Sequence, residues 1–132
     1  MATEITSGTL LHEALSEQII GAAIEVHRQP GPGLLESAYQ ACLAHELSLR
    51  SILFVSQLDL PLTYKGVQLD VGYRIDLLVD DKVIVELKAV EKVLPIHEAQ
   101  LLTYLRLLKK PVGLLLNFSV PVLKDGIIRR LL

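Results

Sequence analysis

Cysteine is almost absent from this sequence, which holds a single one, Cys42, among its 132 residues. One thiol can neither close an internal disulfide nor supply a cysteine cage for zinc, which excludes a disulfide-stapled secreted scaffold and a zinc finger. The first residues also lack the basic start and apolar stretch of a secretory signal. We therefore expect a cytoplasmic protein.

An excess of positive charge and long apolar runs are missing as well. Thirteen Lys and Arg against fifteen Asp and Glu leave a formal net charge of −2, so no long-range field attracts nucleic acid and any phosphate binding must be local. Although 51% of the residues are hydrophobic, charged residues interrupt every apolar run well short of a membrane span. The composition predicts a soluble globular protein without a membrane partner, and its length fits one domain over residues 1–132.

Helical spacing of apolar residues predicts two helices in the first part of the chain. The first covers residues 11–26 with Ser7 or Thr9 as its cap, and the second covers residues 34–50. Between them, the prolines and glycines of QPGPG, residues 29–33, end the first helix and redirect the chain. Four strands are predicted next, in short runs rich in branched and aromatic residues: 52–55, 60–64, 67–79 and 82–88.

A third helix and two more strands are predicted in the last part of the chain. The helix covers residues 95–110 and packs through a leucine stripe. The run VGLLLNF, residues 112–118, is nearly all apolar, as expected of a strand covered on both faces. A closing hairpin is predicted around Asp125 and Gly126. The leucine stripe consists of Leu101, Leu105 and Leu108.

The residues that carry chemistry lie on the predicted strands YRIDLLV and KVIVELK, taken as an antiparallel pair. Alternate side chains of a strand share a face, so one face carries Asp76, Glu86 and Lys88. Asp76 stands directly opposite Glu86 only if the loop has three residues, Asp80–Lys82, because a two-residue turn would put the carboxylates on opposite faces. The other face is apolar and is predicted to meet the main core through Ile75, Leu77, Val79, Val83, Val85 and Leu87.

Two neighbouring carboxylates repel each other, and a divalent cation between them relieves that repulsion. Asp76, Glu86 and the backbone carbonyl of Leu87 would be hard oxygen ligands, which suit magnesium or manganese rather than zinc. Lys88 could orient or deprotonate a water, or offset charge on a transferring phosphoryl group. This set suits metal-assisted hydrolysis of a phosphodiester. A surface salt-bridge cluster is an equally weighted interpretation of these residues alone.

Polar residues on two predicted helices extend this candidate site. On the third helix, Gln100 and Tyr104 lie four residues apart and are predicted to bind substrate, whereas His97 on the same stripe is interpreted as a solvated helix edge. Glu36 follows the glycine-rich turn before the second helix. It either complements the helix dipole or joins the catalytic residues, and we weigh these roles equally.

Several separated motifs resemble the small bacterial GxxExxY proteins, a minimal group within the PD-(D/E)XK nuclease superfamily. The motifs are GLLESAY at residues 33–39, GYRIDLLV, VIVELKAVEKVLPIHEAQLLTYL and VGLLLNFSVPVLKDGI. The resemblance implies an α/β (α+β) fold with a restriction-endonuclease-like core, a central mixed β-sheet flanked by helices in the order α-α-β-β-β-β-α-β-β.

The resemblance also implies roles for individual residues. The metal-binding aspartate corresponds to Asp76, the E-x-K pair to Glu86 and Lys88, and the helical glutamate to Glu36. The Q-x-x-x-Y element of the RecB-like branch corresponds to Gln100 and Tyr104. Two features depart from the family pattern: Ile75 stands in place of the proline before the aspartate, and Glu36 stands where RecB-like enzymes often have a histidine.

Two functions follow as hypotheses. The first is a magnesium- or manganese-dependent nuclease, a hydrolase acting on DNA, with a possible homodimer that would bring separate local cations together. The second is a catalytically inactive interaction or nucleic-acid-binding module that keeps the nuclease fold and acts through partners.

Overall fold

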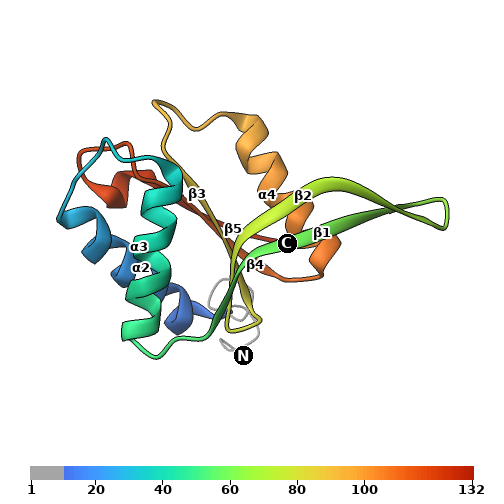
Figure 1. Ribbon diagram of the computed structural model, residues 1–132, viewed down its shortest axis with the longest axis horizontal. Coiled ribbons are helices and arrows are strands. Elements are labelled where there is room, and N and C mark those ends of the chain that lie inside the picture. Colours follow the sequence, from blue (N-terminus) through green and yellow to red (C-terminus); the bar gives the residue numbers. More distant parts are fainter. Residues whose placement is uncertain (1–10) are drawn as a thin grey trace, which may run out of the picture.

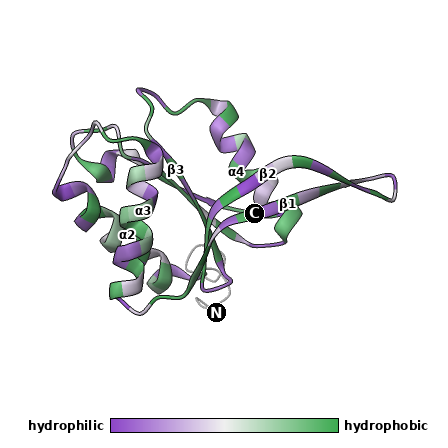
Figure 2. Ribbon diagram, in the orientation of Figure 1, coloured by the Kyte–Doolittle hydropathy of each residue, from purple (hydrophilic) through white to green (hydrophobic). Residues whose placement is uncertain are grey.

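The computed structural model describes residues 11–132, which form one five-stranded sheet with helices on both faces (Figure 1). Helices α2 and α3 lie on one side of the sheet and α4 lies on the other. Hydrophobic and hydrophilic residues are mixed along each helix (Figure 2), as expected of helices with one face on a sheet. The elements are α2 Glu13–Arg28, α3 Glu36–Leu49, β1 Phe54–Tyr64, β2 Val67–Val79, β3 Val83–Lys88, α4 Pro95–Leu108, β4 Val112–Asn117, η1 Leu123–Gly126 and β5 Ile127–Leu131.

The sheet is mixed, as predicted. Its strand order is β1-β2-β3-β4-β5, and only the β3–β4 pair is parallel. Parallel neighbours need a long crossover connection, and α4 supplies it between β3 and β4. Strand β4 is buried along its whole length, which confirms the prediction from its apolar run. Among residues 11–132, no helix is long and apolar enough to cross a lipid bilayer.

The order of elements agrees with the prediction except in the number of strands before α4. The runs 52–55 and 60–64 were expected as two strands, but β1 continues from Phe54 to Tyr64. Pro61 lies inside this strand, and the register shifts between Leu60 and Leu62. A proline is tolerated there because β1 is an edge strand, where a missing N–H removes no necessary ladder bond.

Two local predictions also differ from the structure. No hairpin turns at Asp125; residues 123–126 form the 3-10 helix η1, and β5 then pairs with β4. Gly126 packs so closely on β4 that an added Cβ would lie 2.2 Å from the Asn117 carbonyl oxygen. The first described helix begins at Glu13 after His12, while Ser7 and Thr9, the predicted caps, lie outside the described residues.

A hydrophobic core lies on each face of the sheet, between the strands and the helices that cover that face. The α4 core contains the predicted stripe, with Leu101 and Leu105 buried and Leu108 packed at its edge. Five of the six odd-numbered residues expected in the main core lie there with α2 and α3. The sixth, Ile75, is instead buried in the α4 core.

The predicted β2–β3 register is confirmed. Leu77 pairs with Val85 and Val79 with Val83, so the ladder centres on Asp81 and the loop holds the three residues Asp80–Lys82. Asp80 and Asp81 both adopt positive φ angles, 51° and 56°. Beyond the ladder, the β1–β2 hairpin projects as an arm from the body of the protein (Figure 1).

Candidate active site

Asp76 and Glu86 meet where the β2–β3 ladder stops. The last paired residues are Leu77 and Val85. One step further, the N–H of Asp76 donates to Glu86 Oε2 (2.8 Å) and the N–H of Leu87 donates to Asp76 Oδ2 (2.9 Å). Each carboxylate therefore accepts a backbone N–H of the opposite strand. This exchange holds the two acidic side chains across from one another.

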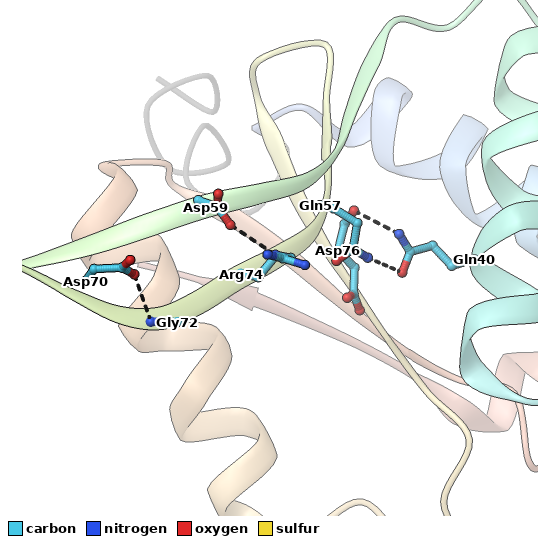
Figure 3. Close-up of polar contacts among 7 residues, drawn as sticks. All are labelled: Gln40, Gln57, Asp59, Asp70, Gly72, Arg74 and Asp76. Carbon is cyan, nitrogen blue, oxygen red and sulfur yellow. Dashed lines mark hydrogen bonds and ion pairs between the residues drawn. The ribbon is translucent and has the colours of Figure 1, made fainter.

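A side chain also binds the backbone carbonyl of Asp76. Gln40 of α3 donates from Nε2 to the Asp76 carbonyl (3.4 Å) and accepts from Gln57 Nε2 (2.8 Å) (Figure 3). Gln57 has a φ of 54°, and the β1–β2 register has no pair at these two residues. In a regular antiparallel strand the N–H and C=O of one residue face the same neighbour, so β2 is distorted at Asp76. The distortion interrupts the side-chain alternation and explains why Ile75 enters the α4 core.

Sequence reasoning missed both glutamines. Gln40 lies four residues after Glu36, hence on the same face of α3, and this spacing was the available signal. Gln57 offered no such signal, because only its place opposite Asp76 gives it a role.

Burial dominates the electrostatics of the acidic pair. The Glu86 side chain is buried, with the residue 6% exposed, and this burial, followed by the charge of Asp76, raises its pKa from 4.5 to about 8. Burial likewise raises the pKa of Asp76, against the hydrogen bond from Leu87, and Glu36 adds to the increase. The nearby Lys88 acts in the opposite direction and lowers both pKa values. The fold thus favours a shared proton or a cation at this pair.

Glu36 reaches the end of β3 from the first turn of α3. Its Oε2 accepts a hydrogen bond from the N–H of Ala89 (3.2 Å), one residue after Lys88. The preceding residue, Leu35, offers no side-chain cap to the helix. Glu36 therefore lies at the helix N-terminus, where the dipole favours it, and also contacts the strand that carries Glu86.

The rest of the GLLESAY segment explains how Glu36 is presented. The ring of Tyr39 is fully buried and stacks on Phe118 (centroids 4.5 Å apart). Its hydroxyl donates to the Gly31 carbonyl and accepts from the N–H of Leu34. Gly33 has a φ of 118°, which side chains rarely allow. These residues hold the turn immediately before Glu36.

The residues predicted on α4 lie at different depths. Tyr104 is only 4% exposed, and burial together with the charges of Glu86 and Asp76 raises its pKa to about 12. Gln100 is half-buried and makes no hydrogen bond to the acidic pair in the part of the chain that the structure describes. His97 accepts a hydrogen bond at Nδ1 from the N–H of Leu94 (3.0 Å), so it caps α4.

The acidic pair offers oxygen atoms to which a metal ion could bind. Asp76 Oδ1 and Glu86 Oε1 accept no hydrogen bond from residues 11–132, which leaves one oxygen of each carboxylate available. The Lys88 carbonyl accepts from the N–H of Phe118 (2.8 Å), and successive residues of a strand direct their backbone groups to opposite neighbours. The Leu87 carbonyl therefore faces β2, on the side of Asp76.

These oxygen ligands suit a small, hard cation that keeps part of its water shell. Within residues 11–132, no three acidic, histidine or cysteine side chains are grouped so as to hold a metal ion. Magnesium is commonly held by one or two carboxylates with several retained waters, which agrees with two carboxylates and one carbonyl.

A comparison with protein families matches the chain to the PD-(D/E)XK nuclease superfamily over residues 13–130. The match begins at the first residue of α2 and extends into β5, so it includes all the candidate residues described above. No curated protein and no solved structure matches the chain.

Proposed function

This chain belongs to the PD-(D/E)XK nuclease superfamily, and we propose that it is a divalent-metal-dependent nuclease that hydrolyses phosphodiester bonds in DNA. The observation that carries the proposal is the pair formed by the half-buried Asp76 and the buried Glu86, with Lys88 beside it. The GLLESAY motif, together with Gln100 and Tyr104, supports a place among the GxxExxY proteins of the RecB-like branch.

Asp76, Glu86 and the Leu87 carbonyl would hold magnesium or manganese. Burial makes the doubly ionised pair unfavourable, as the raised pKa values of both carboxyl groups indicate, and a cation would relieve this. When bound, such an ion polarises a phosphoryl oxygen and lowers the pKa of water.

The remaining residues would bind and orient the substrate. Lys88 would orient the attacking water or offset negative charge that develops on the phosphoryl group. Glu36 would act as a further catalytic carboxylate near the pair rather than as a metal ligand, held beside β3 by its contact with Ala89. Tyr104 is protonated at neutral pH, and its pKa, raised from 10 to about 12, keeps it so in more basic solution. Its hydroxyl can therefore donate to a phosphate oxygen, and Gln100 can donate beside it.

The direct test is cleavage of single-stranded, duplex and branched DNA with magnesium or manganese, with RNA strands in parallel. We expect Asp76→Asn to lower the rate about a hundredfold or more, because it removes a charged ligand. Asp70→Asn is the matched control, since Asp70 lies on the same strand but is exposed on the arm. Equal rates for the two variants would contradict the proposed site.

A second function has its own supporting observation. The acidic net charge and the pair of carboxylates without a third acidic ligand among the described residues favour a nuclease-fold module that acts through partners. Salt-sensitive nucleic-acid binding with no cleavage in manganese would support this module over the enzyme.

A further inference from the structure

A small hollow opens between β2 and α4, beside the candidate active site. Its volume is about 250 Å³, and its walls are mainly apolar and aromatic. This is slightly below the usual range for pockets of drug-sized ligands, so it suits one flat ring system rather than an extended molecule. The lining residues are Tyr73, Ile96, Ala99, Gln100, Thr103 and Tyr104.

Tyr73 and Ile96 leave apolar surface exposed at this hollow. Tyr73 is 37% exposed and Ile96 is 67% exposed, whereas Tyr104 beneath them is buried. The rings of Tyr73 and Tyr104 meet edge to face, with centroids 6.2 Å apart and planes at 62°. Tyr73 therefore leaves part of its surface accessible at the hollow it lines, where an aromatic ligand can contact it.

The hollow is adjacent to the acidic pair along both of its walls. Tyr73 lies three residues before Asp76 on β2. Electrostatic interactions with Glu86, Asp76 and Tyr73 contribute to the raised pKa of Tyr104, so Tyr104 lies near all three. The side chain of Arg74, between Tyr73 and Ile75, pairs with Asp59 instead (3.0 Å; Figure 3). A ligand in the hollow would therefore meet a flat aromatic wall close to the candidate catalytic residues, with the Gln100 carboxamide at its edge.

We propose that this hollow is a nucleobase subsite in which Tyr73 stacks on an unpaired base, so that the substrate is single-stranded at the cleavage position. This inference rests on the proposed nuclease function. Every nucleobase has a π-face, so stacking on tyrosine is tolerant of sequence. A base inside a duplex has both faces covered by its neighbours and would have to lose its stacking and pairing before it could enter, whereas an unpaired base is spared this cost. Because the protein has a net charge of −2, stacking would supply affinity that a broad basic surface supplies elsewhere.

The experiment measures binding and cleavage of a fluorescein-labelled oligothymidylate and of the same strand annealed to its complement. Binding is followed by anisotropy with calcium, and cleavage with magnesium or manganese. We expect the single strand to be preferred and Tyr73→Ala to weaken its binding about tenfold or more, as for other base-stacking aromatics. Tyr73→Phe keeps the ring and should stay near the parental value.

Two further variants separate stacking from general damage. Ala99→Leu should weaken binding by filling the hollow from an exposed helix position, without loss of thermal stability. Tyr64→Ala, at the far end of the same hairpin, is the matched control and should bind like the parent.

Equal use of duplex and single strand, or equal binding by Tyr73→Ala and Tyr64→Ala, would overturn the subsite while leaving the nuclease proposal in place. Absence of cleavage with either metal, together with Tyr73-dependent binding of the single strand, would overturn the nuclease function and support the subsite as a binding site.

Discussion

At the scale of single residues, Asp76 and Glu86 combine two opposing effects. Backbone N–H donors hold both carboxylates in place and favour their charged forms, but burial of Glu86 disfavours its charge more strongly. Ionisation of most carboxyl groups in proteins raises the free energy of unfolding, whereas ionisation of this pair lowers it. The same imbalance makes the site sensitive to both protons and cations.

The first prediction concerns stability against pH in the presence of a chelator. The pKa of Glu86 rises from 4.5 to about 8 on folding, so its stabilising effect is complete below about pH 4.5 and is lost as pH rises toward 8. We expect the free energy of unfolding in urea to fall over this interval, by roughly 3 to 5 kcal/mol from Glu86. Glu86→Gln should flatten the profile, and Glu91→Gln, on the exposed surface after β3, should leave it unchanged. A parental profile that rises with pH would contradict this prediction.

The second prediction separates catalysis from architecture at Lys88. Lys88→Met keeps the aliphatic stem and removes the charge that lowers the pKa values of Asp76 and Glu86. We expect a folded variant that binds metal and nucleic acid but cleaves about a hundredfold more slowly or worse. Lys82→Met is the control, because Lys82 pairs with Asp80 in the β2–β3 turn. Cleavage near the parental rate would show that Lys88 is structural.

At the scale of elements, the approach of α4 to the sheet decides where Gln100 and Tyr104 lie. Gly113 of β4 permits this approach, because an added Cβ would lie 2.8 Å from Cδ1 of Leu101. Leu101 is itself buried in the α4 core, so it has little room to move. A glycine in a central strand is usually unfavourable, and here close helix packing accounts for it.

The third prediction tests this packing. Gly113→Ala should lower the free energy of unfolding by about 1 to 3 kcal/mol through overpacking. Leu101→Ala should lower it by about 2 to 5 kcal/mol through the cavity it leaves. In the double variant the new methyl group has space, so the loss should be smaller than the sum of the two single losses. Additive losses in urea unfolding would show that the two residues do not meet as described.

At the scale of the whole molecule, the protein is slightly acidic and still has to engage a polyanion in the proposed function. A bound divalent cation would offset the acidic pair at the one place where a phosphate must approach. Metal binding should therefore stabilise the fold and prepare the site together.

The fourth prediction is a rise in melting temperature with magnesium or manganese. A ligand at a hundred times its dissociation constant stabilises the folded state by about 2.7 kcal/mol, which corresponds to several degrees for a domain of this size. Asp76→Asn and Glu86→Gln should each reduce this rise, while Asp70→Asn should retain it. An unchanged rise in the Asp76→Asn, Glu86→Gln double variant would place the ion elsewhere.

The sequence by itself determined the features that depend on local pattern. Alternation of apolar and polar residues on two adjacent segments predicted that Asp76, Glu86 and Lys88 share one face. The β2–β3 register and the three-residue loop followed, because a slip of one residue would have put Asp76 and Glu86 on opposite faces of the sheet. The continuous apolar run of β4 predicted a strand covered on both faces, and the leucine spacing of α4 predicted its buried stripe. In each case the order of apolar and polar side chains along one segment shows which of its faces is buried.

Only the tertiary structure decided the features that join distant segments. The sequence predicted two separate strands, 52–55 and 60–64, but pairing along β2 joins them into the single edge strand β1, which tolerates Pro61 through a shifted register. The distortion at Asp76 depends on Gln40 and Gln57, which come from α3 and β1, and it moves Ile75 to the other core. The hollow beside Tyr73 forms only where β2 passes α4. Contacts of this kind depend on the relative placement of whole elements, which the periodicity of any single segment does not encode.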